Sequence, residues 1–388
     1  MVEVGSEASA LHQRILTVDA HADIEVPGRP SAYVGRDGRS RVATEKLRAG
    51  GLDAVVMAVA AGPGPRDPSG YAAARRVADR KLRAVFDLVA EPAARMALAR
   101  SASEVRTAKD RGLAAAILAF QNTQIIGTDL DALGDFHEAG CRFFALTHIG
   151  HNDCADSSRP NFDPVRGSHE PIEEHGGLSA LGRRAVDRIG ALGGVIDVSQ
   201  LSEAATLQVL EQVDRPVVAS HSNVRARCAV SRNLSDREID GIATGGGVVC
   251  VTPFQGYLFD SSDERVMAGI RAVRRDAGLP EDCHYPFELY WELPDGEPRT
   301  DFLRAVRSVL GRATIDTMLD HLDHVVARVG IEHAGIGTDW NHGGGITGLQ
   351  EATDAPNVTE ALLARGRRES EIEAIWGGNV LRVLDTTT

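Results

Sequence analysis

The sequence contains no long apolar run and no recognisable export signal. No stretch reaches the roughly 18 uninterrupted apolar residues that a membrane-spanning helix needs. The first seven residues are acidic in character and lack the apolar core of a secretory signal peptide. We therefore expect no membrane partner and a cytoplasmic location.

Basic residues are also too few to bind nucleic acid. The 42 Lys and Arg residues stand against 55 Asp and Glu residues, which gives a net charge of −13. Such a chain repels phosphate backbones, and without a basic cluster no local counterion release offsets the repulsion. We expect no nucleic-acid partner. Only three residues are lysines (Lys46, Lys81 and Lys109), a bias that indicates genome composition rather than function.

Two further absences narrow the fold and the chemistry. The cysteines are few, odd in number and scattered, without a Cys-x-x-Cys pair, so neither a disulfide framework nor a thiolate zinc site is indicated. The chain also lacks a Gly-x-Gly-x-x-Gly motif after its first strand-like run, which disfavours an open dinucleotide-binding sheet. The cysteines are Cys141, Cys154, Cys228, Cys250 and Cys283.

Eight short apolar runs rich in β-branched residues recur, and most are followed by a helical pattern. Runs without strict alternation suit parallel strands that are buried on both faces. Eight β-then-α units predict a closed (β/α)8 TIM barrel that occupies residues 1–388 as one domain. The runs are residues 15–20, 54–60, 114–120, 142–147, 194–198, 216–220, 247–252 and 334–338.

Helix signals lie between these runs. Apolar residues recur at helical spacing over 71–90, and Ser179 is placed to cap a helix over 180–192. Two pairs have capping-box spacing, Ser235 with Glu238 and Ser370 with Glu373.

Two long segments interrupt the β/α rhythm. Residues 151–177 form a polar loop after the fourth strand, and residues 253–312 form a long insertion between strands seven and eight. Loops of this length are usually functional or independently structured. The insertion holds the aromatic cluster Cys283–Trp291 in a chain with only 5% aromatic residues. It fits either a lid over the barrel mouth or a small satellite core.

Polar residues follow most of the predicted strands, at the end of the barrel where chemistry takes place in this fold. His21 and Asp23 are spaced i and i+2, so both can point toward one cation. Ser-His-Ser around His221 is, taken alone, more typical of a hydrogen-bonded core histidine. The gathering of several such residues predicts an active site; they are Asp19, His21, Asp23, Gln121, His148, Gln200, His221 and Asp339.

These residues lie in motifs that resemble the renal (membrane) dipeptidase family of the amidohydrolase superfamily. The resemblance covers nearly the whole chain in family order, apart from the segment around 257–312, which is longer than the family pattern. The matching segments are 18–23, 146–148 with Asn152, 155–157, 177–179, 195–197, 220–222, 231–233, 320–324, 337–339 and 378–383.

The resemblance implies a barrel, usually dimeric, that holds two zinc ions around a hydroxide and hydrolyses dipeptides. Its ligands are a His and an Asp after strand one, a bridging Glu after strand three, and a His after each of strands five and six. The residues carried over are His21 and Asp23 as the first ligand pair, His221 as the strand-six ligand, His148 as the group that polarises the scissile carbonyl, Arg232 as the anchor of the substrate carboxylate and Asp339 as the proton handler.

Two ligand positions depart from this pattern. Gln121 stands where the bridging Glu is implied, and Gln200 stands where the strand-five His is implied. Neutral amides are weak zinc ligands, and two dications would remain poorly compensated in a low-dielectric pocket. We therefore predict at most one zinc ion, or none. The candidate ligands are His21 and Asp23, with Asp339 or His221.

Three functions are compatible with this site. The first is hydrolysis of a small dipeptide- or amino-acid-like substrate at a depleted, mononuclear centre. The second is a metal-independent isomerase, lyase or decarboxylase that uses Asp339, His148 and His221 as acid and base. The third is a non-catalytic binding protein. Because the carboxylate anchor, the polarising His and the proton-handling Asp all remain, an enzyme is favoured.

In either enzyme we expect the partner to be a small molecule with a free carboxylate. The predicted substrate-binding residues are Arg232, Gln121, Gln200 and Asn152.

Overall fold

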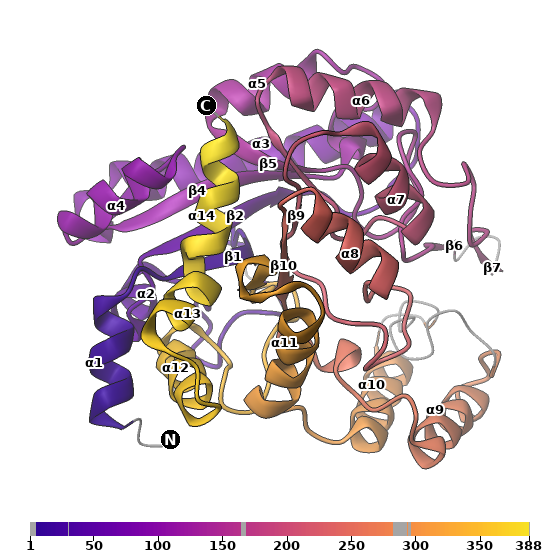
Figure 1. Ribbon diagram of the computed structural model, residues 1–388. Coiled ribbons are helices and arrows are strands. Elements are labelled where there is room, and N and C mark those ends of the chain that lie inside the picture. Colours follow the sequence, from indigo (N-terminus) through magenta and orange to yellow (C-terminus); the bar gives the residue numbers. More distant parts are fainter. Residues whose placement is uncertain (1–4, 30, 164–167, 282–292, 294–295, 388) are drawn as a thin grey trace.

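Eight parallel strands form the central sheet of the computed structural model, which describes residues 5–29, 31–163, 168–281, 293 and 296–387. Helices surround the strands (Figure 1). Each predicted run overlaps one strand, so the (β/α)8 barrel is confirmed. In sheet order the strands are β1 (Val18–Asp23), β2 (Ala54–Ala60), β4 (Ala114–Gln121), β5 (Cys141–Ala145), β8 (Val195–Asp197), β9 (Val218–Ala219), β10 (Val248–Val251) and β11 (Ala334–Ile336).

The barrel closes where the carboxyl ends of β1 and β11 meet. The Asp339 N–H donates to the His21 carbonyl at 2.9 Å, and the Asp19 carboxylate accepts from the Thr338 N–H at 2.8 Å and the Thr338 hydroxyl at 2.6 Å. Gly337 lets β11 lie close to the end of β9, because a Cβ there would overlap the Ser220 carbonyl oxygen. The closure brings His21 and Asp339 side by side.

The helices follow the expected order, with two of the three predicted caps confirmed. Ser179 accepts from the Gly182 N–H at 3.0 Å, and Ser235 forms a capping box with Glu238. The predicted cap at Ser370 is wrong, since the helix there already begins at Glu369. The helices are α1 (Ser6–Arg14), α2 (Thr44–Gly50), α3 (Pro68–Ala90), α4 (Ala102–Asp110), α5 (Ala132–Ala139), α6 (Ala180–Ala191), α7 (Glu203–Gln212), α8 (Asp236–Thr244), α9 (Glu264–Asp276), α10 (Glu297–Leu310), α11 (Ile315–Val329), α12 (Ala355–Ala364), α13 (Glu369–Glu373) and α14 (Asn379–Leu384).

The first helix packs against helices that lie close to the carboxyl terminus in the sequence. Figure 1 shows α1, in indigo, beside the yellow carboxyl-terminal helices, and Arg14 forms an ion pair with Glu369 at 2.9 Å. Among the described helices, none combines the length and apolar character needed to cross a bilayer.

Three short strands were not predicted from the sequence. β3 (Met96–Leu98) pairs with the amino-terminal half of β4, while β6 (Phe162–Asp163) and β7 (Ser168–His169) pair antiparallel within the long loop after β5. Each has two or three residues, too few for a hydrophobic period to be recognised.

The segment between β10 and β11 contributes most of a separate hydrophobic cluster, which we call the third core because the barrel has two others. Helices α9 and α10 lie side by side at the edge of the molecule (Figure 1) and pack over a cluster separate from the barrel core. The predicted aromatic cluster Cys283–Trp291 lies outside the described residues, and the lid stays a prediction. The fully buried members of the third core are Cys228, Val230, Tyr257, Phe259, Ile270, Phe302 and Val306.

A buried histidine of α11 makes stability depend on pH. His321 accepts a hydrogen bond from the Val224 N–H through Nδ1 at 3.0 Å, and burial lowers its pKa to about 3. An unfolded histidine titrates near pH 6.5, so below that pH the unfolded chain binds more protons and stability falls. When the pH falls from 7 to 5, protonation of this residue in the unfolded chain should lower the free energy of unfolding by about 2 kcal/mol.

Urea unfolding at the two pH values tests this effect. His321→Gln keeps an acceptor but does not titrate, so its free energy of unfolding should fall by about 2 kcal/mol less than that of the wild type. An equal decline in both proteins would show that His321 is not responsible.

Candidate active site

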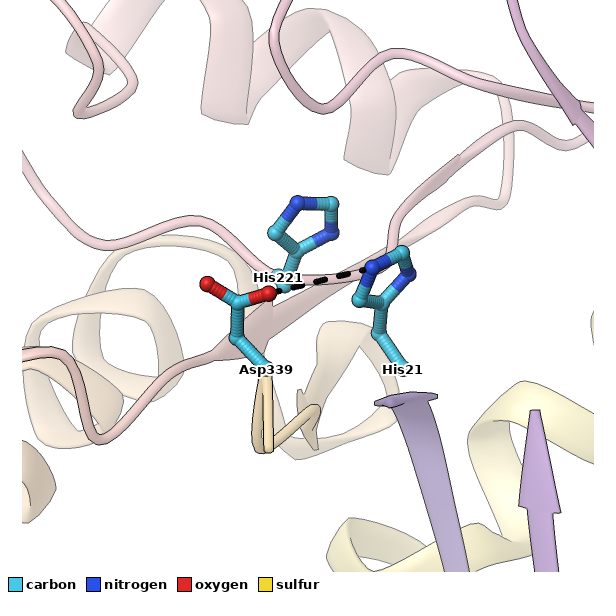
Figure 2. Close-up of side chains that lie close together, drawn as sticks. All are labelled: His21, His221 and Asp339. Carbon is cyan, nitrogen blue, oxygen red and sulfur yellow. Dashed lines mark ion pairs between the residues drawn. The ribbon is translucent and has the colours of Figure 1, made fainter. Parts of the chain in front are cut away.

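Three buried side chains converge at the carboxyl end of the barrel. His21 belongs to β1, His221 follows β9 and Asp339 follows β11; their candidate ligand atoms all lie within 4.8 Å of one another. His21 Nε2 is 3.9 Å from Asp339 Oδ1, and the two imidazole rings stack with centroids 3.7 Å apart (Figure 2). We call these three residues the His–His–Asp group; it can hold one metal ion.

A serine hydroxyl behind the group orients both imidazoles. Ser220 Oγ donates to Asp197 Oδ2 at 2.5 Å, and it lies 2.8 Å from His221 Nδ1 and 3.4 Å from His21 Nδ1. Because the hydroxyl proton is used by Asp197, Ser220 accepts from His221 Nδ1–H. This tautomer leaves a lone pair on His221 Nε2, facing the site.

The side-chain amide of Gln200 donates a hydrogen bond to that lone pair. Gln200 Oε1 accepts from the Arg159 guanidinium at 3.0 Å, which directs Gln200 Nε2 toward His221 Nε2 at 3.3 Å. Arg159 also donates to the Tyr257 hydroxyl at 2.9 Å. Gln200 therefore hydrogen-bonds the imidazole nitrogen through which His221 would bind a metal ion.

Asp23 does not join the His–His–Asp group. Its Oδ1 accepts from Lys81 Nζ of α3 at 2.5 Å, and its Oδ2 lies 3.4 Å from His342 Nδ1. The register of β1 against β2 shifts between Asp19 and Ala22, as in a β-bulge. A bulge re-aims side chains, so the i, i+2 spacing does not place His21 and Asp23 on one cation.

Strained backbone recurs at these strand ends. Asn122, Gln200 and Asp339 have positive φ values of 88°, 76° and 53°. Such conformations are costly for non-glycine residues and cluster at functional sites. At Gln200 the side chain contacts His221, at Asp339 it joins the His–His–Asp group, and at Asn122 it hydrogen-bonds the neighbouring loops.

Burial sets the protonation of the His–His–Asp group. Desolvation lowers the pKa of His21 to about 3 and that of His221 well below its usual range, so both rings are neutral near pH 7. Desolvation also raises the pKa of Asp339 to about 6, although the charges of His342 and Arg232 partly oppose it. Asp339 can therefore exchange a proton near neutral pH.

Asp23 behaves in the opposite way. Burial alone would raise its pKa, but the charge of Lys81 and the hydrogen bonds from His342 and Lys81 outweigh burial and hold the pKa below its usual range. Asp23 thus remains an ionised carboxylate paired with an ammonium.

Several buried polar atoms at this end have no hydrogen-bond partner in the described part of the chain. They include Gln121 Nε2, His148 Nδ1, Arg232 Nε and Asp339 Oδ1, in side chains of residues that are at most 4% exposed. Buried polar atoms are rarely left unpaired, so such a gathering indicates a ligand.

Arg232 is a buried guanidinium whose charge acts on Asp339 without forming an ion pair with it. Its terminal nitrogens donate to Ser222 Oγ at 2.8 Å and to the His221 carbonyl at 2.5 Å, and among the described residues no carboxylate forms an ion pair with it. Asp236, a candidate structural partner, instead pairs with His324 and Arg328.

Asn152 is the predicted site residue that the structure places elsewhere. Its Nδ2 donates to Asn122 Oδ1 and the Leu146 carbonyl, and its Oδ1 accepts from the Cys154 and Ala155 N–H groups. Its amide therefore holds the loop after β5 against Asn122 at the end of β4, and its contact with substrate stays a prediction.

Four residues near the site were missed by sequence reasoning. Arg159 and Tyr257 lie in the long loop after β5 and in the segment after β10, both of which had been singled out by length. Lys81 and His342 follow no strand end directly, and no sequence signal marks them. The four are Lys81, Arg159, Tyr257 and His342.

The closed parallel barrel and the His–His–Asp group at its carboxyl end define an amidohydrolase-like protein. The model of the membrane dipeptidase family, peptidase family M19, matches residues 6–388. The chain belongs to this family.

Solved structures and curated proteins agree with this membership. The crystal structure of the probable dipeptidase PvdM from Pseudomonas aeruginosa has a TM-score of 0.86 and 31% identity, covering 98% of this chain and 97% of that one. A metallopeptidase from Rhodobacter sphaeroides with a phosphinate mimic of the dipeptide L-Ala-D-Ala has a TM-score of 0.70 and 22% identity, covering 96% of this chain and 99% of that one; it shows the fold alone.

Dipeptidase tcpJ of Claviceps purpurea is 27% identical over 294 residues, covering 75% of this chain and 55% of that protein. Human Dipeptidase 3 is 26% identical over 270 residues, covering 69% of this chain and 44% of that protein. The chain thus spans about half the length of the curated relatives it matches.

Zinc fits this site only in part. The His–His–Asp group has the three protein ligands typical of a catalytic zinc, but His221 can bind an ion only if the Gln200 amide moves away from its Nε2. Other candidate ligands are already engaged, since the Lys81 ammonium contacts Asp23 and the Gln200 amide contacts His221 Nε2.

Restoring stronger ligands should strengthen zinc binding. Gln121→Glu combined with Gln200→His replaces two amides by a carboxylate and an imidazole beside His221, so zinc should bind at least about tenfold more tightly, roughly 1.4 kcal/mol. Competition with a chromophoric chelator measures the Kd. Gln212→Glu on α7 adds a charge away from the mouth and should leave the Kd unchanged. An unchanged Kd in the double variant would show that the surrounding residues have diverged as well.

Proposed function

We propose that the protein is a hydrolase that cleaves a dipeptide or a closely related amide carrying a free carboxylate, with at most one zinc ion. The observation that carries this proposal is the buried Arg232 guanidinium, which has no carboxylate partner among the described residues and lies beside the His–His–Asp group. A buried charge needs a counter-charge, and a substrate carboxylate supplies one.

Arg232 is suited to hold that carboxylate. A guanidinium has five N–H donors in a planar fork, and Ser222 and the His221 carbonyl use only two of them. The Tyr257 ring lies 5.5 Å from the guanidinium carbon and fixes its plane. The remaining donors bind the carboxylate and orient the substrate.

The other residues of the site act on the scissile bond. His148 is neutral near pH 7 because burial lowers its pKa, and its ring can donate a hydrogen bond to the carbonyl oxygen. The unpaired Gln121 amide supplies a further donor. Asp339, with a pKa raised to about 6, takes a proton from the water that adds to the carbonyl carbon and gives it to the amine that leaves as the C–N bond breaks. Zinc, where bound by the His–His–Asp group, supplies a Lewis acid at this point.

A metal-independent isomerase, lyase or decarboxylase is the second candidate. The hydrogen bond between Gln200 and His221 and the ion pair between Lys81 and Asp23 favour it, because each occupies an atom that a metal would use. Metal content separates the two: dipeptide hydrolysis lost to a chelator and regained with zinc supports the hydrolase, and a metal-free active protein supports the alternative.

The relatives support a dipeptide substrate through their names, since two curated relatives and a solved structure are named as dipeptidases. Dimerisation and a cytoplasmic location stay predictions from the sequence.

The role of Arg232 is tested by Arg232→Lys. Lysine keeps the charge but loses the planar fork, so kcat/KM toward a hydrolysed dipeptide should fall at least about tenfold, or roughly 1.4 kcal/mol. The melting temperature should barely change. Arg237→Lys, at an exposed position of α8, serves as the matched control and should alter neither quantity.

A substrate whose carboxylate is converted to an amide should be equally poor with wild type and Arg232→Lys. If the variant instead melts several degrees lower with unchanged kcat/KM, Arg232 is a structural residue and the substrate class is wrong.

A further inference from the structure

Lys81 reaches the active site from a helix outside the barrel. It lies on α3, and its ammonium is 2.5 Å from Asp23 Oδ1, with side chains that are 11% and 13% exposed. The other two lysines serve elsewhere: Lys46 pairs with Asp37 and Glu351, and Lys109 pairs with Asp53 ahead of β2, at the amino end of the barrel.

Both oxygens of the Asp23 carboxylate face N–H donors of the protein. Besides Lys81, its Oδ1 accepts from the Ile24 N–H at 2.9 Å, and its Oδ2 faces His342 Nδ1 at 3.4 Å. A metal ion at the same carboxylate would lie next to an ammonium, and two cations at such a distance repel strongly where water is scarce. The ammonium and a metal ion are therefore alternatives at Asp23.

The ammonium also acts on the rest of the mouth. Behind the larger effect of burial, its charge contributes to lowering the pKa of both His21 and His148. A cavity of about 540 Å³ has Asp23 in its wall, together with residues of β2 and α3. This cavity gives an ion access to the Asp23 carboxylate. Whether an ion binds there therefore depends on Lys81, which already contacts the carboxylate.

We propose that Lys81 is the resident cation of this active site: its ammonium occupies Asp23 and withholds that carboxylate from metal. The cation position beside β1 is thus filled by the chain itself. Any zinc is left to the His–His–Asp group, without a fourth protein ligand from Asp23. This inference concerns the metal count of the proposed function and does not depend on the substrate.

Zinc affinity of the full-length protein without substrate tests the proposal. Lys81→Met removes the ammonium while keeping an unbranched chain, so Asp23 becomes available and zinc should bind at least tenfold more tightly than to wild type. The Kd is read by competition with a chromophoric chelator, and circular dichroism confirms the fold. Lys109→Met breaks a comparable ion pair at the amino end and should leave the Kd unchanged.

Two further variants separate ligation from loss of charge alone. Lys81→Arg keeps a cation and should bind zinc like wild type. Lys81→Met with Asp23→Asn should lose the gain, because the freed carboxylate is gone. Should Lys81→Met fail to fold, Lys81→Gln, which keeps a donor without the charge, provides the same comparison.

A Kd that Lys81→Met and Lys81→Gln leave unchanged would overturn the proposal, as would a gain that survives Asp23→Asn. Dipeptide hydrolysis by wild type is a separate measurement, so the hydrolase proposal can fail while this one stands, and the reverse.

Discussion

Three cationic side chains of the protein lie at the barrel mouth. Lys81, Arg159 and Arg232 surround the His–His–Asp group, and the two arginines are at most 5% exposed. Charges taken out of water are expensive unless they are paired. Lys81 is paired with Asp23, whereas Arg232 has no carboxylate among the described residues. This constraint underlies both proposals made above, the limited metal content and the substrate with a free carboxylate.

The fold supplies this arrangement by bringing distant segments to one end of the barrel. Closure between β1 and β11 sets His21 beside Asp339, and Ser220 after β9 holds both imidazoles from behind. Positive φ values at Gln200 and Asp339 show that the loops give up backbone stability to aim these side chains. The positions of these side chains therefore depend on the strand ends, whose conformations are set by the sheet.

The barrel was predictable because buried parallel strands leave a repeated apolar pattern, and a fixed rule places function after those strands. That rule found His21, His221 and Asp339. It failed for Asp23, because the irregular register of β1 changes where the side chain points. It also failed for Lys81, since helical spacing does not tell which side chain of α3 reaches across to the barrel mouth.

Arg159 and Tyr257 illustrate the same limit. Both come from segments whose length predicted a functional or independently structured loop. Their hydrogen bond, 2.9 Å between guanidinium and hydroxyl, joins residues 98 positions apart in the sequence. Contacts of this kind depend on tertiary structure and leave no local pattern.

The central claim is that this member of the membrane dipeptidase family has room for one metal ion at most. Anomalous X-ray scattering from crystals soaked in zinc tests it most directly. The account predicts either no peak or a single peak within reach of His21, His221 and Asp339, with Lys81 still on Asp23. Two peaks about 3.5–4 Å apart, the spacing of working two-metal sites, would contradict it.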